Sequence, residues 1–178
     1  NSIIIAQAGL DFSPVLVQVP GAGSSDLSTN DFGSGDGGFT VSPPVTPETD
    51  WTYTPGSWRS NGQESGFGES NVSYLTSPPY TLTRSGIFTL TFSHRFSFEV
   101  GFDGGVVEYN INGGAYKRVP ASAFTLNGYN VSLGVDAVAP LINQQAFGSN
   151  SPGHPAFITS TCRAGVGNAG DVVTVRFM

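Results

Sequence analysis

The sequence contains little charge and a single cysteine. Charged residues make up 11% of the 178 positions. An average globular protein has roughly 25%, so the solubility of this chain must depend on neutral polar residues. Because Cys162 is alone, no internal disulfide and no thiolate zinc cluster can form. We expect its side chain to be a small buried apolar group.

Basic residues and long apolar runs are also scarce. Seven basic residues oppose thirteen acidic ones, for a formal net charge of −6. The chain lacks the clustered basic stripe that a phosphate backbone requires, so we expect no nucleic acid partner. The sequence has no run of about twenty apolar residues, so it predicts no transmembrane segment. An acidic, lysine-poor chain rich in Ser, Thr and Asn fits a secreted or cell-surface location, with the periplasmic side as an option.

Helical spacing is absent, whereas an alternating pattern is pronounced in residues 87–100. Apolar and polar residues alternate there, as in a strand with one buried and one exposed face. The apolar positions are Phe88, Leu90, Phe92, His94, Phe96, Phe98 and Val100. Asp103-Gly104-Gly105 then predicts a hairpin turn into a strand at 106–111, and Asn112-Gly113-Gly114 predicts a second turn. We therefore predict a meander of three strands.

Short β-like segments continue through the rest of the chain, separated by Gly, Pro and Asn. They lie at 39–41, 72–75, 80–83, 124–126, 131–135, 137–142, 156–161 and 172–178. Residues 51–58 carry two tryptophans and follow three prolines, which predicts an irregular aromatic loop. Many short strands with turn signals between them predict an all-β, antiparallel sandwich or jelly roll.

The beginning of the chain differs from the rest. Residues 1–20 contain two apolar β-like runs, and such a segment must pair with something to avoid aggregation. Residues 21–38 are rich in Gly, Ser and Asp, which is typical of a flexible linker. We therefore divide the chain into an apolar arm (1–20), a linker (21–38) and a sandwich (39–178).

Several segments together resemble the MAM-like jelly-roll domain, an appendage of secreted bacterial immune-inhibitor-A-type metallopeptidases. The segments are Gly38 to Val41, Trp51, Leu75 to Pro78, Leu90 to Arg95, Phe102 to Tyr109, Asn112 to Gly114 and Gly170 to Phe177. The resemblance implies a lectin-like sandwich without catalysis, used in adhesion or in carbohydrate or protein contact. It also implies calcium, held by acidic loop residues near the first strand.

Two features depart from this family pattern. The family continues past the final V-x-V-R-F strand to one more strand, whereas this sequence ends at Met178. The apolar arm at the other end is the second departure. We expect the sandwich to expose an open sheet edge, and the arm to fill such an edge by β-augmentation.

Three groups of residues are candidates for a site. Asp31, Asp36 and Asp103 could provide oxygen ligands for calcium, although Asp also shapes turns. Trp51, Tyr53 and Trp58 could form a platform for sugar stacking, or could instead cap one end of the sandwich. The arm could bind a partner through its apolar residues, which are Ile3, Ile4, Ile5, Val15, Leu16, Val17 and Val19.

Catalytic signals are missing from the sequence. His94 and His154 are the only histidines, and no G-x-S-x-G motif or other nucleophile context accompanies them. We expect His94 to be a packed core residue and the protein not to be an enzyme.

Two functions of different classes follow from these features. The first is a non-catalytic structural or adhesive module in which the arm inserts into the sheet of a neighbouring copy, or folds back into its own. The alternative is a carbohydrate-binding or accessory domain of a larger secreted enzyme.

Overall fold

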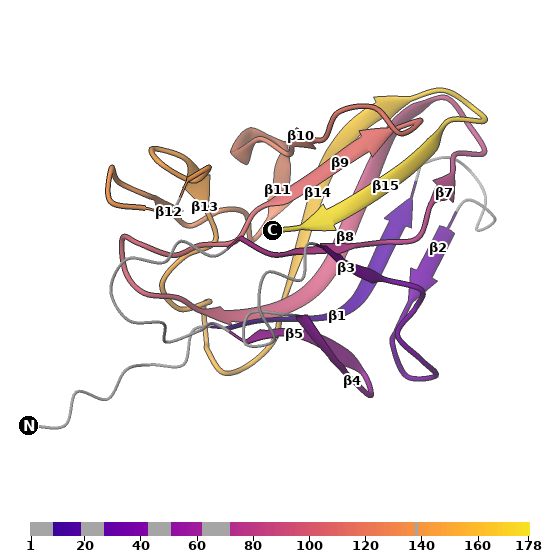
Figure 1. Cartoon of the computed structure of the whole chain (residues 1–178). Coiled ribbons are helices and arrows are strands. Elements are labelled where there is room, and N and C mark those ends of the chain that lie inside the picture. The colour runs from indigo at the N-terminus through magenta and orange to yellow at the C-terminus, as the bar shows by residue number, and fades with distance from the viewer. Residues whose placement is uncertain (1–8, 19–26, 43–50, 62–71, 138) are drawn as a thin grey trace, which may run out of the picture.

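The computed structural model describes residues 9–18, 27–42, 51–61, 72–137 and 139–178. Within these ranges the chain forms antiparallel strands in two main sheets that face each other (Figure 1). In the same ranges the helical structure is a 3₁₀ turn, η2 (Ala121–Ala123). The prediction of an all-β sandwich is confirmed, and the jelly-roll order of connections stays a prediction.

The larger sheet has seven strands and contains the beginning of the described chain. In spatial order it consists of β11 (Phe124–Leu126), β14 (Ile158–Gly167), β8 (Gly86–Ser97), β1 (Gly9–Gln18), β5 (Ser57–Asn61) and β4 (Trp51–Thr54), and β2 (Leu27–Asn30) pairs with β1. β8 therefore lies between β14 and β1, the two other long strands of this sheet.

The second sheet has six strands and contains the last strand of the chain. It consists of β10 (Lys117–Arg118), β9 (Val107–Ile111), β15 (Val172–Phe177), β6 (Tyr74–Thr76) and β3 (Thr40–Ser42), and β7 (Tyr80–Thr81) pairs with β15. A separate hairpin of β12 (Val131–Ser132) and β13 (Gln145–Ala146) lies at one end of the sandwich.

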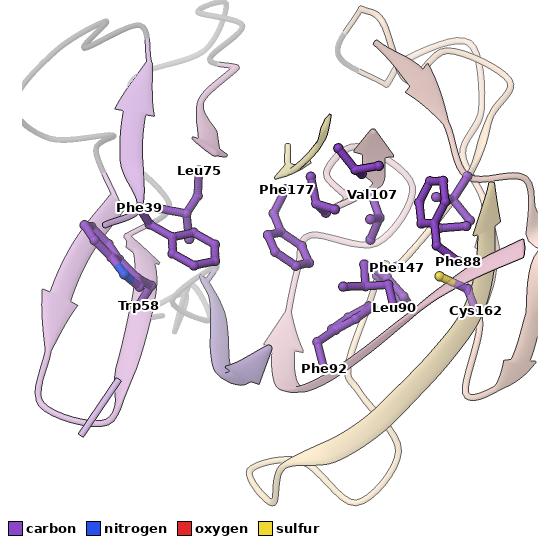
Figure 2. Close-up of a cluster of buried hydrophobic side chains, with 14 of the residues drawn as sticks. Phe39, Trp58, Leu75, Phe88, Leu90, Phe92, Val107, Phe147, Cys162 and Phe177 are labelled. Atoms are coloured by element: carbon purple, nitrogen blue, oxygen red, sulfur yellow. The ribbon is translucent and has the colours of Figure 1, made fainter. Parts of the chain in front are cut away.

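Aromatic side chains from both sheets fill the space between them (Figure 2). On β8 the buried residues alternate as predicted, with Phe88, Leu90 and Phe92 fully buried. The ring of Phe92 meets that of Phe177 on β15 edge to face at a centroid distance of 5.3 Å. Such contacts add to the apolar burial that stabilises a sandwich.

The predicted meander is wrong in its first half. β8 and β9 lie in different sheets, and residues 98–106 cross from one to the other. Asp103-Gly104-Gly105 therefore does not close a hairpin. The second half is confirmed, because β9 and β10 pair with each other across the turn at Asn112-Gly113-Gly114.

Three other local predictions need correction. Residues 51–61 form the β4–β5 hairpin rather than an irregular loop, since Gly56 supplies the left-handed turn residue at φ 92°. In the segment 137–142, the described residues form turns instead of a strand. Part of the predicted linker, Leu27–Asn30, is strand β2.

Candidate functional site

The candidate site is the position that β1 occupies in the larger sheet. β1 lies between β8 on one side and β5 and β2 on the other, so both of its edges are paired (Figure 1). Its first half pairs with β5 and its second half with β2. We call this position, bounded by β8, β5 and β2, the strand slot.

The register of β1 in the strand slot is defined along its length. Val15 lies opposite Phe92 and Val17 opposite Leu90, two fully buried residues of β8. The register shifts between Phe12 and Val15, so two residues of β1 stand opposite Ser93 alone. One of these two is a proline, which has no N–H to donate and is tolerated in a strand at such a bulge.

The sheet depends on β1 for its continuity. Without β1, the long edge of β8 that faces away from β14 would expose its backbone N–H and C=O groups. In the described part of the chain, β5 pairs with β1 and β4, so β1 also connects the β4–β5 hairpin to the rest of the sheet. The sequence predicts that the arm fills an open sheet edge; in the structure the described part of the arm, β1, lies inside the larger sheet and pairs with strands of the same chain.

The structure describes some of the predicted partner-binding residues and not others. Val15, Leu16 and Val17 belong to β1 and pair with β8 and β2. Ile3, Ile4, Ile5 and Val19 lie outside the described residues.

The three aromatic residues proposed for sugar stacking belong to the sandwich interior. Trp51 and Trp58 are 5% and 6% exposed, and Tyr53 is half-buried. The indole N–H of Trp58 donates to the carbonyl of Asp36 at 2.9 Å. Burial removes the ring faces that a sugar needs, so these residues do not form an exposed platform in this structure, and the capping alternative describes them better.

The three candidate calcium ligands lie in two separate places. Asp31 and Asp36 share the loop after β2, where each accepts a backbone N–H, from Gly33 and Gly38 at 2.9 Å. This loop borders a hollow of about 400 Å³, lined by Asn30, Asp31, Ser34, Gly35 and Gly37.

Asp103 lies in the β8–β9 connection, where burial and the neighbouring Glu99 raise its pKa. No group of three acidic, His or Cys residues within the described ranges is arranged to hold a metal ion. Calcium binding stays a prediction.

His94 is fully buried, as the alternation on β8 predicts. Its Nε2 lies 2.7 Å from the hydroxyl of Ser160 on β14, and burial lowers the pKa of His94 to about 3. Cys162 is also fully buried, and burial raises the pKa of its thiol to about 12. Neither group is placed to meet a substrate.

One cluster was missed by the sequence analysis. The guanidinium of Arg176 lies between the rings of Tyr74 and Tyr116, at 4.0 and 3.7 Å from their centroids. It forms an ion pair with Oε2 of Glu108, and Nη2 of Arg118 lies 3.6 Å from Oε1 of the same carboxylate. These side chains come from four strands of the smaller sheet and the loop between β9 and β10, so no local sequence pattern could indicate the whole cluster.

Comparisons with family models, curated proteins and solved structures find no match to this chain. The MAM-like resemblance stays a prediction. Among the described residues, no helix has the length and apolar character to cross a membrane.

Proposed function

We propose that this chain is a non-catalytic extracellular structural module that assembles by exchanging its first strand between copies. In each copy the strand slot is filled by β1, either from the same chain or from a neighbour. The observation that supports this most directly is the place of β1, a strand from the beginning of the chain seated inside the sheet.

Exchange between copies would preserve every backbone hydrogen bond of β1, because the same registers with β8, β5 and β2 can form in either arrangement. The connection between β1 and β2 reads V-P-G-A-G-S-S-D at 19–26, a composition compatible with alternative paths. An exchange in one direction does not close on itself. Repeated from copy to copy, it generates a chain of subunits rather than a dimer.

The non-catalytic part of the proposal is supported by the burial of the candidate chemical groups. His94 and Ser160 hydrogen bond to each other in the interior, away from any substrate. The carbohydrate-binding alternative has less support, because Trp51 and Trp58 are buried.

Mixing two variants, each with one new cysteine, tests the exchange. Both carry Cys162→Ala; one also carries Leu16→Cys and the other Thr91→Cys, two positions that lie directly opposite each other. A disulfide between them requires the strand of one molecule to occupy the slot of another. We expect a disulfide-linked heterodimer on non-reducing gels.

Two controls make the result interpretable. A double variant with both cysteines in one chain should cross-link within the chain and show that the pair has suitable geometry. Leu16→Cys mixed with Ser132→Cys, an exposed position on β12, should give no specific product. If the double variant cross-links and the mixture gives no heterodimer at any concentration, exchange does not occur and the proposal is wrong.

A further inference from the structure

Asp11 is the single charged residue in the sequence of the arm, residues 1–20. The register of the sheet places Asp11 directly opposite Arg95 on β8 and directly opposite Arg59 on β5. One acidic position is thus flanked on both sides by a basic position, in a chain with only seven basic residues. Opposite charges at directly paired positions favour a pairing, and like charges oppose it.

The flanking strands make this arrangement specific. β8 has one arginine in its twelve residues, and β5 has one in its five. A shift of β1 by two residues along β8 would place Asp11 opposite Ser97 or Ser93 instead. The corresponding shift along β5 would place it opposite Asn61 or Ser57. Only the observed register places the acidic position directly opposite both basic positions.

The apolar pattern of β1 cannot distinguish the observed register from one shifted by two residues. A slip of one residue exchanges the two faces of a strand, so the apolar pattern excludes it, but a slip of two residues restores the faces. The bulge near Pro14 moves with the strand, and ladder positions repeat every two residues, so the proline remains tolerated after such a slip. Another feature must therefore select among the even registers.

We infer that Asp11 is the residue that sets the register of the strand in its slot, through Arg95 and Arg59. The strand slot then recognises an extended segment with an acidic residue at this one position and the apolar pattern of β1. The occupant that meets this requirement is the first strand of this chain or of a second copy. For a second copy the inference rests on the proposed function, whereas for the same chain it stands alone.

Cross-linking within one full-length chain measures the register. In the Cys162→Ala background, Leu16→Cys is combined with Thr91→Cys for the observed register, or with Thr89→Cys or Ser93→Cys for the two slipped ones. Directly opposite positions are within disulfide range and diagonal ones are not. We expect the parent sequence to cross-link efficiently only with position 91. Asp11→Asn should raise the slipped products by about fivefold.

A charge reversal and a matched control separate register from general stability. Reversing all three charges, with Asp11→Arg, Arg95→Asp and Arg59→Asp, should restore the preference for position 91. Asp36→Asn removes one negative charge from an exposed loop and can still cap that loop, so it should leave the ratio of products unchanged.

Unchanged ratios in a folded Asp11→Asn variant would overturn the inference. If Asp11→Asn fails to fold, the parent sequence in about 1 M salt provides the test, because salt at this concentration screens charges beyond about 3 Å. The slipped products must then increase, and constant ratios would again contradict a role for Asp11. The mixing experiment tests the proposed function separately. A missing heterodimer there would contradict exchange between copies, but it would not contradict the role of Asp11 within one chain.

Discussion

The imidazole Nε2 of His94 lies 2.7 Å from the hydroxyl oxygen of Ser160, and both residues are completely buried. The hydroxyl of Ser160 donates to the carbonyl oxygen of Asn127. Its oxygen must therefore accept from His94, which requires the proton of the neutral ring to be on Nε2. Since burial disfavours the charged ring and lowers the pKa of His94 to about 3, the folded protein holds a neutral histidine.

Mild acid should destabilise the protein through His94. Its pKa is about 6.5 in an unfolded chain and about 3 in the fold, so between these values only the unfolded chain takes up the proton. The stabilisation is complete above pH 6.5 and decreases as the pH falls. We expect the free energy of unfolding to decrease by about 2 kcal/mol from pH 7 to pH 5, measured by urea unfolding.

Two substitutions check the origin of this pH dependence. His94→Phe places a ring among Phe92, Phe96 and Phe147 and removes the titrating group, so it should flatten the dependence over this range. His154→Gln changes an exposed histidine and should leave the dependence as it is. An equally steep dependence in His94→Phe would show that other groups cause it.

Gly165 on β14 should not tolerate a side chain. A Cβ there would lie 2.8 Å from the rings of Phe88 and Tyr109, which are packed edge to face across the sandwich. Gly165→Ala should reduce the free energy of unfolding by about 1–3 kcal/mol. Gly134→Ala is the matched control, because no atom lies within 4 Å of its added Cβ, and it should be nearly neutral. Similar melting temperatures for the two variants would contradict this packing.

Arg176 should resist replacement by lysine. Its guanidinium Nε and Nη2 lie 2.7 and 2.6 Å from one carboxylate oxygen of Glu108, and two tyrosine rings cover its faces. An ammonium group cannot stack in this way, so Arg176→Lys should cost about 1–2 kcal/mol in chemical unfolding. Arg163→Lys, on an exposed position of β14, should change little. Equal effects of the two substitutions would argue against the stacked arrangement.

Asp171 should contribute to stability at neutral pH through the turn before β15. The backbone N–H of Asn168 and the amide of Asn112 donate to its carboxylate and lower its pKa. Its contribution is therefore present above the ordinary pKa of an aspartate and is lost as the pH falls below it. Asp171→Ala should lower the melting temperature at pH 7, and the difference should narrow in strong acid. Asp136→Ala, in an exposed loop, provides the comparison; a difference independent of pH would contradict this role.

The sequence indicates where individual strands lie better than it indicates which strands pair with each other. The alternation on β8 correctly indicates that Phe88, Leu90, Phe92, His94 and Phe96 are buried. It extends too far, however, since the strand ends at Ser97 and Val100 is 74% exposed. Alternation shows that a strand has one buried face, but it does not show which sheet the next strand joins. For this reason the β8–β9 hairpin was predicted wrongly.

The aromatic hairpin could have been found from the sequence. Thr54-Pro55-Gly56-Ser57 is a turn signal, and tryptophan and tyrosine alternate with polar residues on either side of it. By contrast, the strand slot combines segments far apart in the sequence. The apolar runs of the arm indicate that it must pair, but only the fold shows that Asp11 stands between Arg95 and Arg59.

The pairing of β1 with β8 also constrains the order of events in folding. Gln18 pairs with Thr89, so about seventy residues separate the two partners along the chain. During synthesis β1 leaves the ribosome well before β8, so the edge that pairs with β8 stays open, whereas β2 and β5 come earlier in the chain and pair with the other edge. Pairings over such a distance form slowly, because closing the long loop precedes the gain from the contacts. In this interval the backbone N–H and C=O groups on that edge of β1 have no strand partner.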